Sequence, residues 1–331
     1  MIYSYFPGCS LEKNAASYNI SSIATSTALG MEFVEVEDWN CCGATEYISL
    51  NLTASFALIA RNLAQATKND SIKQLVAPCS ACYLNLRKCD KYMNESPKFA
   101  TKINLALAED GLSYQAGTLK IRHLLDVVVN DVGLEAVKAK VVKPLHGLRI
   151  APYYGCMIVR PDFGKDKKDG PTFDNTEYPN TLDELLKVLG AEVVDFPYKA
   201  HCCGGHMTQI SESTGFELIR RLIKGADDYH ADMIVTLCPM CQLNLDGFQG
   251  PMNNYFKTGY KMPVLYFTQM MGLAFGIEPT KLGFGSELVS ARQALSKIGV
   301  EVPEPEIPEQ KPRPKKDDKS LPMPQIPKKS G

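Results

Sequence analysis

The sequence predicts an α/β fold made of two similar halves, each built on a largely parallel sheet, with an extended tail. Three observations lead to this prediction. Strand and helix signals alternate along each half, one cysteine pattern occurs twice, and residues 301–331 contain eight prolines. The first half is therefore expected at 1–145, the second at 146–300 and the tail at 301–331, whose composition cannot form a core of its own.

Each half is expected to contain strands that lead directly into the cysteine groups. Strands are predicted near 2–6, 32–36, 72–77, 148–153, 192–196 and 232–237. Helices are predicted near 14–29, 52–67, 80–92, 181–189, 214–227 and 239–247, with further helices in 93–147 and 248–300. Parallel strands bring the loops at their carboxyl ends to one edge of a sheet. The cysteines of each half should therefore meet there.

Ten of the eleven cysteines form two copies of one pattern, a lone Cys, then Cys-Cys-Gly, then Cys-x-x-Cys. The ten are Cys9, Cys41, Cys42, Cys79 and Cys82 in the first half and Cys156, Cys202, Cys203, Cys238 and Cys241 in the second. Five thiols per half is one more than a tetrahedral zinc or an ordinary four-iron cubane uses. This surplus favours a distorted iron–sulfur cluster with a shared thiolate.

Each part of the pattern has a simpler interpretation when taken alone. A single Cys-x-x-Cys is typical of zinc sites and of redox dithiols, and adjacent cysteines can be two small buried hydrophobes. Four thiolates of either half can also hold zinc. Because the full pattern occurs twice, the sequence favours two metal clusters over these alternatives.

The composition excludes several classes of function. With 36 Lys and Arg against 37 Asp and Glu, the charge is balanced, and no basic stripe indicates nucleic-acid binding. No apolar run is long enough to span a bilayer, and no signal peptide is recognisable. We expect a cytoplasmic chain, in which reduced thiols are available for metal.

The residues that carry the pattern resemble the cysteine-rich Cys-Cys-Gly (CCG) domain proteins, and in particular the B subunit of heterodisulfide reductase. The resemblance covers residues 1–300 and implies two pseudo-symmetric, Rossmann-like CCG domains. It further implies two noncubane [4Fe-4S] clusters, each held by the five cysteines of one half.

The resemblance also implies an activity and partners. The family reduces the mixed disulfide of coenzyme M and coenzyme B in methanogenesis, and related proteins act on other disulfides. Splitting a disulfide takes two electrons, whereas one cluster usually passes one, so two clusters match the reaction. The expected partners are a ferredoxin-like C subunit together with a flavin-containing A subunit, because this sequence has no flavin loop or ferredoxin cysteine run.

Four residues near the cysteines are candidates for substrate chemistry. His201 and His206 flank the second Cys-Cys-Gly and are candidate proton donors. Lys199 and Arg160 are candidates for binding anionic groups of the substrate. Each can equally be an ordinary surface or packing residue.

Three further features stand beside the pattern. Trp39 precedes Cys41 and either shields a cluster or is a core aromatic. Cys89 has no counterpart in the second half, which predicts a structural role. The polar segment 160–170 either lines a substrate entrance or is simply solvated.

Two other functions remain open at this stage. The chain can serve in electron transfer within a related CCG complex that acts on a quinone or another sulfur substrate. It can also be a zinc-stabilised scaffold.

Overall fold

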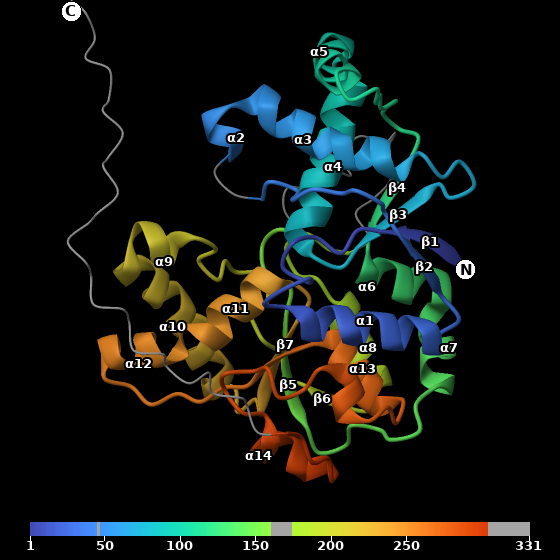
Figure 1. Cartoon of the computed structure of the whole chain (residues 1–331). Coiled ribbons are helices and arrows are strands. Elements are labelled where there is room, and N and C mark those ends of the chain that lie inside the picture. Colours follow the sequence, from blue (N-terminus) through green and yellow to red (C-terminus); the bar gives the residue numbers. More distant parts are fainter. Residues whose placement is uncertain (45–46, 160–173, 304–331) are drawn as a thin grey trace, which may run out of the picture.

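Two four-stranded parallel sheets, one in each half, form the centre of the protein (Figure 1). The computed structural model describes residues 1–44, 47–159 and 174–303. The strand orders are β2-β1-β3-β4 and β6-β5-β7-β8. The strands are β1 Ile2–Tyr5, β2 Glu32–Glu35, β3 Gln74–Ala77, β4 Lys120–His123, β5 Arg149–Tyr153, β6 Glu192–Val193, β7 Met233–Thr236 and β8 Val264–Tyr266. All pairs between these strands run parallel, which confirms the predicted α/β class.

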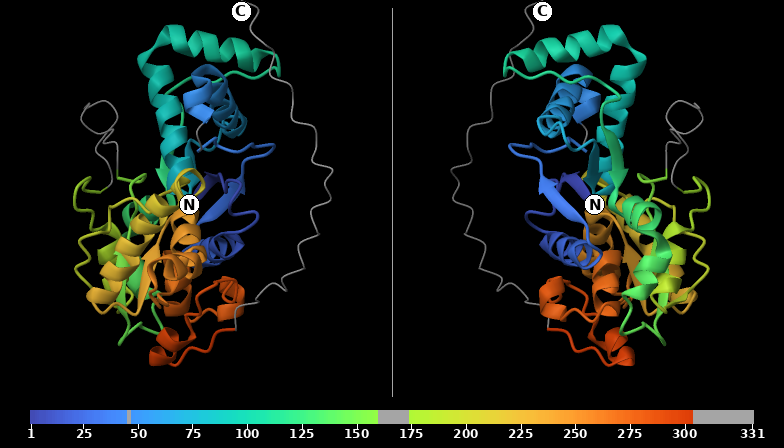
Figure 2. Two further views of the ribbon diagram at one scale, coloured as in Figure 1. Left: turned by 90° about the vertical axis from the view of Figure 1, so that its left-hand side faces the viewer. Right: turned by 90° about the vertical axis from the view of Figure 1, so that its right-hand side faces the viewer.

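The helices of the first half connect these strands and extend beyond them. They are α1 Ala16–Ala28, α2 Tyr47–Leu50, α3 Leu52–Ala66, α4 Ser80–Glu95, α5 Pro97–Ala108, α6 Leu124–Val127 and α7 Leu134–Ala139, with a π-helical turn between the last two. Asn51 starts α3 by accepting a hydrogen bond from the Ala54 N–H at 3.0 Å, as expected of an N-cap. The side views in Figure 2 show α4 rising from the sheet, where it contacts β3 and β4, toward α5, which lies away from the sheets.

The second half repeats the order of strands and main helices. Its helices are α8 Thr181–Val188, α9 Met207–Ile210, α10 Glu212–Asp228, α11 Pro239–Gly247, α12 Gln249–Phe256, α13 Phe267–Ala274 and α14 Arg292–Leu295. The start of α11 at Pro239 agrees with the preference of proline for the first helical position. As predicted, each cysteine group follows one of the strands, and both Cys-x-x-Cys segments open a helix.

The fourth strand of each sheet, β4 and β8, was not predicted, because 93–147 and 248–300 were expected to add only helices. In β4 the charged Arg122 hides the strand pattern. This side chain is nevertheless 3% exposed, because its guanidinium bonds Asp126 and Asp131, each at 2.6 Å. Two paired carboxylates offset the cost of burying its charge. The predicted strand near 192–196 is also shorter than expected and ends at Val193.

The main hydrophobic core crosses the predicted boundary between the halves. Helix α1 of the first half packs against α13 of the second, and the two lie side by side in Figure 1. The buried Ser21 and Thr268 hydroxyls are 2.7 Å apart in this contact. One core cluster contains residues from both halves, while a smaller cluster belongs to the second half. The halves are therefore similar in topology but share their packing.

Among the described residues, no helix is both long enough and apolar enough to cross a membrane.

Candidate metal centres

The five cysteines of each half lie together at the carboxyl edge of its sheet. In the first half, Cys9 Sγ is 3.6 Å from Cys41 Sγ, and Cys42 Sγ is 3.1 Å from Cys82 Sγ. The second half repeats these contacts, since Cys156 is hydrogen-bonded to Cys202 and Cys203 to Cys241. Thiols that are 32 and 40 positions apart in the first half are thus brought together, as the repeat predicted.

Each set has a solvent-facing side and a buried side. We call the lone cysteine and the first of the adjacent pair the outer thiols, and the other three the inner thiols. The outer thiols are exposed or half-buried, and the inner thiols are buried. A group held by all five would therefore have one edge open to a substrate or partner and one edge inside the protein.

The glycine that precedes each lone cysteine packs closely against an inner sulfur. A Cβ atom on Gly8 would lie 2.8 Å from Cys82 Sγ, and one on Gly155 would lie 2.9 Å from Cys241 Sγ. Both glycines have positive φ, +75° and +69°, a conformation that other residues adopt only at a cost. The sequence showed the repeated Gly-Cys pair but not this role. Glycine at these positions therefore lets the backbone before the lone cysteine approach the inner sulfur closely.

Hydrogen bonds between the outer thiols favour one thiolate in each half. In the second half, the hydrogen bond from Cys156 lowers the pKa of Cys202 to about 6, helped by the Gly204 N–H, which lies 3.3 Å from the sulfur. In the first half, hydrogen bonds from Cys42 and Cys9 lower the pKa of Cys41. The thiolate is the form that binds metal. Each half therefore presents a preformed ligand near solvent.

These shifts predict an order of reactivity in the metal-free chain. Cys41 and Cys202 should react with iodoacetamide at neutral pH at least about tenfold faster than Cys89, because they are thiolates near solvent. Burial raises the pKa of Cys89, which keeps it protonated. Timed quenching and peptide mass spectrometry measure the three rates. Labelling of Cys89 as fast as the outer thiols would contradict the assignment.

The two sets also meet each other between the sheets. The thiols of Cys79 and Cys238, the first cysteines of the two Cys-x-x-Cys segments, are within hydrogen-bonding contact. This contact raises the pKa of Cys79, and the bonds from Cys241 and Cys79 lower the pKa of Cys238. Groups bound by the two halves would be neighbours, with inner edges facing each other.

The donor chemistry fits iron and sulfide. Thiolate ligands select iron–sulfur clusters, zinc or Cu(I), and here the sulfurs form close pairs. In 1–44, 47–159 and 174–303, no three His, Cys, Asp or Glu side chains are arranged to hold a single metal ion. Cys9, Cys41, Cys42, Cys79 and Cys82 are the candidate ligands of one group, and Cys156, Cys202, Cys203, Cys238 and Cys241 those of the other.

A family comparison agrees with this geometry. The model of the cysteine-rich CCG domain matches residues 3–87 and 150–246, which include all ten paired cysteines and leave out Cys89. The chain belongs to the CCG domain family. Each of the two matched CCG domains covers the first three strands of one sheet and leaves out the fourth, β4 or β8.

Relatives of this CCG protein are similar over most of its length. It is 34% identical over 87% of the chain to a protein from Wolinella succinogenes named 8-methylmenaquinol:fumarate reductase membrane anchor subunit, and it covers 97% of that protein. It is 30% identical to a protein from Archaeoglobus profundus whose name likens it to the B subunit of heterodisulfide reductase, over 85% of this chain and 92% of the relative. A protein from Methanosarcina acetivorans, named as the B subunit of a ferredoxin/F420H2-dependent CoB-CoM heterodisulfide reductase, is 28% identical. The match covers 89% of this chain and 96% of the relative.

One solved structure shares the fold. A crystal structure of a hypothetical protein from Helicobacter pylori matches with a TM-score of 0.67 at 14% identity. The match covers 87% of this chain and 52% of that one.

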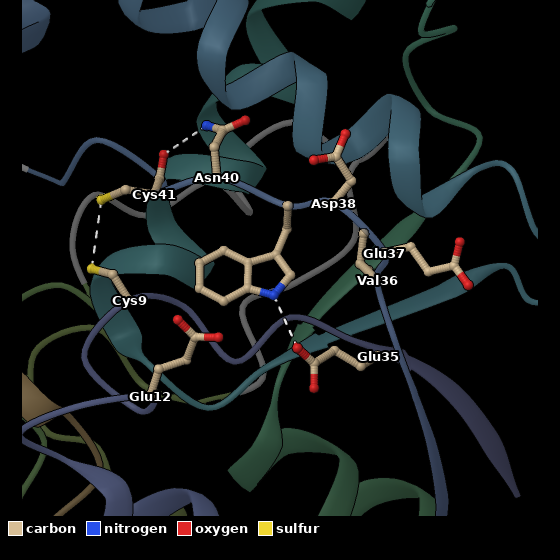
Figure 3. Close-up of a pocket in the computed structure, with 9 residues that line it drawn as sticks. Cys9, Glu12, Glu35, Val36, Glu37, Asp38, Asn40 and Cys41 are labelled. Atoms are coloured by element: carbon tan, nitrogen blue, oxygen red, sulfur yellow. Dashed lines mark hydrogen bonds between the residues drawn. The ribbon is translucent and has the colours of Figure 1, made fainter.

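An acidic pocket of about 470 Å³ borders the outer thiols of the first CCG domain. Figure 3 shows Cys9 and Cys41 at one end with the carboxylate of Glu12 near Cys9, while Glu35 lies toward the other end of the pocket. Trp39 lines this pocket, and its Nε1 donates to Glu35 at 3.0 Å. The tryptophan borders the outer thiols and also packs edge-on against Phe6 of the main core, which agrees with the interpretation as a core aromatic and leaves the shielding of a cluster untested.

The two histidines lie on either side of the second Cys-Cys-Gly but differ in environment. The His201 ring contacts Arg221 through Nδ1 and packs edge-on against Tyr198. His206 is half-buried at the start of α9. Its Nε2 has no hydrogen-bond partner in the part of the chain that the structure describes.

The two cationic candidates for substrate binding have different outcomes. Lys199 is 2% exposed, and its Nζ bonds the buried Asp183 at 2.8 Å. Its carbonyl also accepts the N–H groups of Tyr154 and Gly155, at 2.8 and 3.1 Å, just before Cys156. This placement opposes the expected contact with a substrate anion and makes Lys199 a support of the cysteine loop. Arg160, like the rest of the segment 160–170, lies outside the described residues.

Cys89 lies apart from both sets. It is fully buried in α4, seven residues or about 10 Å beyond Cys82. Its sulfur contacts the Phe56 carbonyl at 3.6 Å and Met93 Sδ at 3.8 Å. These contacts agree with the structural role that the sequence suggested.

Proposed function

We propose that each CCG domain holds one noncubane [4Fe-4S] cluster on its five cysteines, and that the chain is the disulfide-reducing subunit of a heterodisulfide reductase type complex. The observation that carries this proposal is the pair of five-thiol sets whose inner edges meet at Cys79 and Cys238. The similarity to proteins named after the B subunit of heterodisulfide reductase supports the reaction. Cytoplasmic reducing conditions would keep the thiols free for iron.

Two facing one-electron centres suit the reduction of a disulfide. The reaction takes two electrons and two protons, breaks one S–S bond and releases two thiols. Iron–sulfur clusters, when bound, would supply single electrons. An iron with an open coordination position would also bind a sulfur atom of the substrate. The exposed outer thiols place an edge of each candidate site within reach of a small disulfide.

The protein's own residues would supply protons near the second site. His206, whose Nε2 is buried with no partner among the described residues, is a candidate donor to a departing thiolate. His201 is a second candidate, held in place by Arg221 and Tyr198. The electrons would come from a ferredoxin-like C subunit together with a flavin-containing A subunit, as the resemblance implies.

A second candidate function is electron transfer between a quinol and a partner enzyme. The specific observation in its favour is the 34% identity to the Wolinella succinogenes protein named as a subunit of 8-methylmenaquinol:fumarate reductase. The same paired clusters would then pass electrons without splitting a disulfide.

One experiment separates the two functions. The iron-loaded full chain is reduced under anaerobic conditions and mixed either with the coenzyme M–coenzyme B disulfide or with a menaquinone analogue. The proposal predicts that the disulfide reoxidises the protein, with two thiols released for every two electrons. Reoxidation by the quinone but not by the disulfide would replace the first function with the second.

A further inference from the structure

Two backbone carbonyls mark the place where the CCG domains meet. Pro78 precedes Cys79, and Leu237 precedes Cys238, so each carbonyl is one peptide unit away from an inner cysteine. The hydroxyl of Tyr18 lies 2.9 Å from the Pro78 oxygen and 3.2 Å from the Leu237 oxygen. Burial raises the pKa of Tyr18, so the hydroxyl stays protonated. It donates to the carbonyl oxygens of both loops.

His123 lies beside the same two carbonyls on another element. It is fully buried at the end of β4, and its Nδ1 accepts the Leu125 N–H at 3.1 Å. Burial lowers the pKa of His123 to about 4, while the nearby carbonyls of Leu237 and Pro78 act in the opposite direction. The hydroxyl of Tyr18 therefore bonds both carbonyls, and the buried His123 ring packs next to them.

Both side chains are held by the packing between the halves. The Tyr18 ring stacks on Tyr266 with 4.2 Å between centroids and 1° between planes. In the sheets, His123 pairs with Ala77 and Tyr266 pairs with Thr236, which are the last residues of β3 and β7. Both His123 and Tyr266 are also N-caps of the following helix. They are therefore equivalent residues of the two repeats, gathered at one point.

The sequence did not indicate this arrangement. Tyr18 lies in a serine- and threonine-rich helix of the first half, and the carbonyl of Leu237 belongs to the second half, 219 residues away. His123 and Tyr266 end the two strands that were not predicted.

We propose that Tyr18, through its two hydrogen bonds, and His123, through its packing beside the same carbonyls, are positioning residues that hold the two inner cysteine loops together and thereby set the spacing of the two clusters. The inference rests on the proposed function, because it concerns clusters held by Cys79 and Cys238. A hydrogen bond to a carbonyl one peptide away from a ligand restrains that ligand directly. Electronic and magnetic coupling between two metal centres falls steeply with their separation, so a small movement of these loops has a measurable effect.

The test compares the spin–spin interaction of the fully reduced clusters in the iron-loaded full chain. Tyr18→Phe keeps the stacking on Tyr266 but removes the shared proton. His123→Asn keeps an acceptor for the helix N-cap. Its shorter side chain no longer packs beside the carbonyls of Pro78 and Leu237. We expect both variants to retain the iron and sulfide of the parent chain, while the spin–spin splitting in electron paramagnetic resonance is reduced or lost.

Two control variants separate positioning from general stability. Tyr114→Phe removes another buried hydroxyl, which bonds Asp90 at 2.5 Å and does not touch the cysteine loops; the splitting should stay at the parent value. His123→Gln fills more of the space of the imidazole than asparagine does and should restore most of the splitting. An unchanged splitting in Tyr18→Phe and His123→Asn at full iron content would overturn the inference and leave the proposed function intact.

A measurement without iron covers the case in which a variant loads poorly. Mild oxidation of the metal-free full chain should link Cys79 to Cys238, because their thiols are in contact, and peptide mass spectrometry gives the yield. The yield should fall in Tyr18→Phe but not in Tyr114→Phe. Equal yields in the two variants would contradict the proposed positioning role. Failure of the parent chain to bind iron would instead remove the proposed function, and this inference with it.

Discussion

Cys203→Ala should abolish disulfide reduction and remove the iron of one half, leaving about four of about eight iron atoms per chain. Cys203 is 4% exposed and is hydrogen-bonded to Cys241, while Asn244 Nδ2 lies 3.4 Å from its sulfur. An alanine methyl cannot bind iron, and no other thiol replaces the missing one. Cys41→Ala should act in the same way on the first half. Iron analysis and a disulfide reduction assay with reduced carrier measure both effects.

Cys89→Ala is the matched control for these variants. It also removes a buried thiol. In the described part of the chain, the hydrogen-bonding contacts of this thiol are with the Phe56 carbonyl and with Met93 Sδ. We expect the full iron content, near-normal reduction, and a loss of about 1 kcal/mol in the free energy of unfolding. A folded Cys89→Ala chain without activity would show that the cysteines have been wrongly divided between the cluster ligands and the core.

Lys199→Met should lower the free energy of unfolding by about 3 to 5 kcal/mol, the cost of removing one partner of a buried ion pair. Asp183 would lose its charged partner and keep the hydrogen bond from the Tyr154 hydroxyl, at 2.6 Å. Burial raises the pKa of Asp183 even in the intact protein, which reflects the cost of its charge there. Urea unfolding of the metal-free chain, followed by circular dichroism, gives the change.

Lys187→Met provides the control for this prediction. Lys187 pairs with Glu184 at 2.9 Å on the exposed side of α8, and exposed pairs contribute about 1 kcal/mol or less. The urea concentration at the unfolding midpoint of Lys187→Met should stay close to that of the parent chain. If Lys199→Met were equally stable but bound an anionic disulfide more weakly, Lys199 would be a substrate ligand after all.

The sequence predicted which cysteines come together because spacing and repetition are visible in it. In each half, five cysteines that follow three strands can meet only if the carboxyl ends of those strands share one edge of a sheet, and the alternation of elements indicated that they do. The surroundings of the ligands were harder to predict. The fate of Lys199 depends on Asp183, sixteen residues earlier, and nothing in the local sequence shows that the two meet in the core.

The contacts between the halves were also beyond prediction from sequence. The bonds from Tyr18 to Pro78 and Leu237 depend on how α1 lies against α13, which follows from the packing of both halves. Strand β4 was missed because Arg122 is charged, and its burial becomes favourable only when Asp126 and Asp131 fold onto it. Local pattern therefore predicted the two sets of cysteines, and long-range packing determined how the sets face each other.

The most direct test of the central claim is the metal content of the full chain purified under anaerobic conditions. Iron, acid-labile sulfide and zinc are measured on the same sample. Two clusters predict about eight iron and eight sulfide per chain, with no stoichiometric zinc. Zinc in stoichiometric amount without iron would contradict the account and favour a zinc-stabilised scaffold.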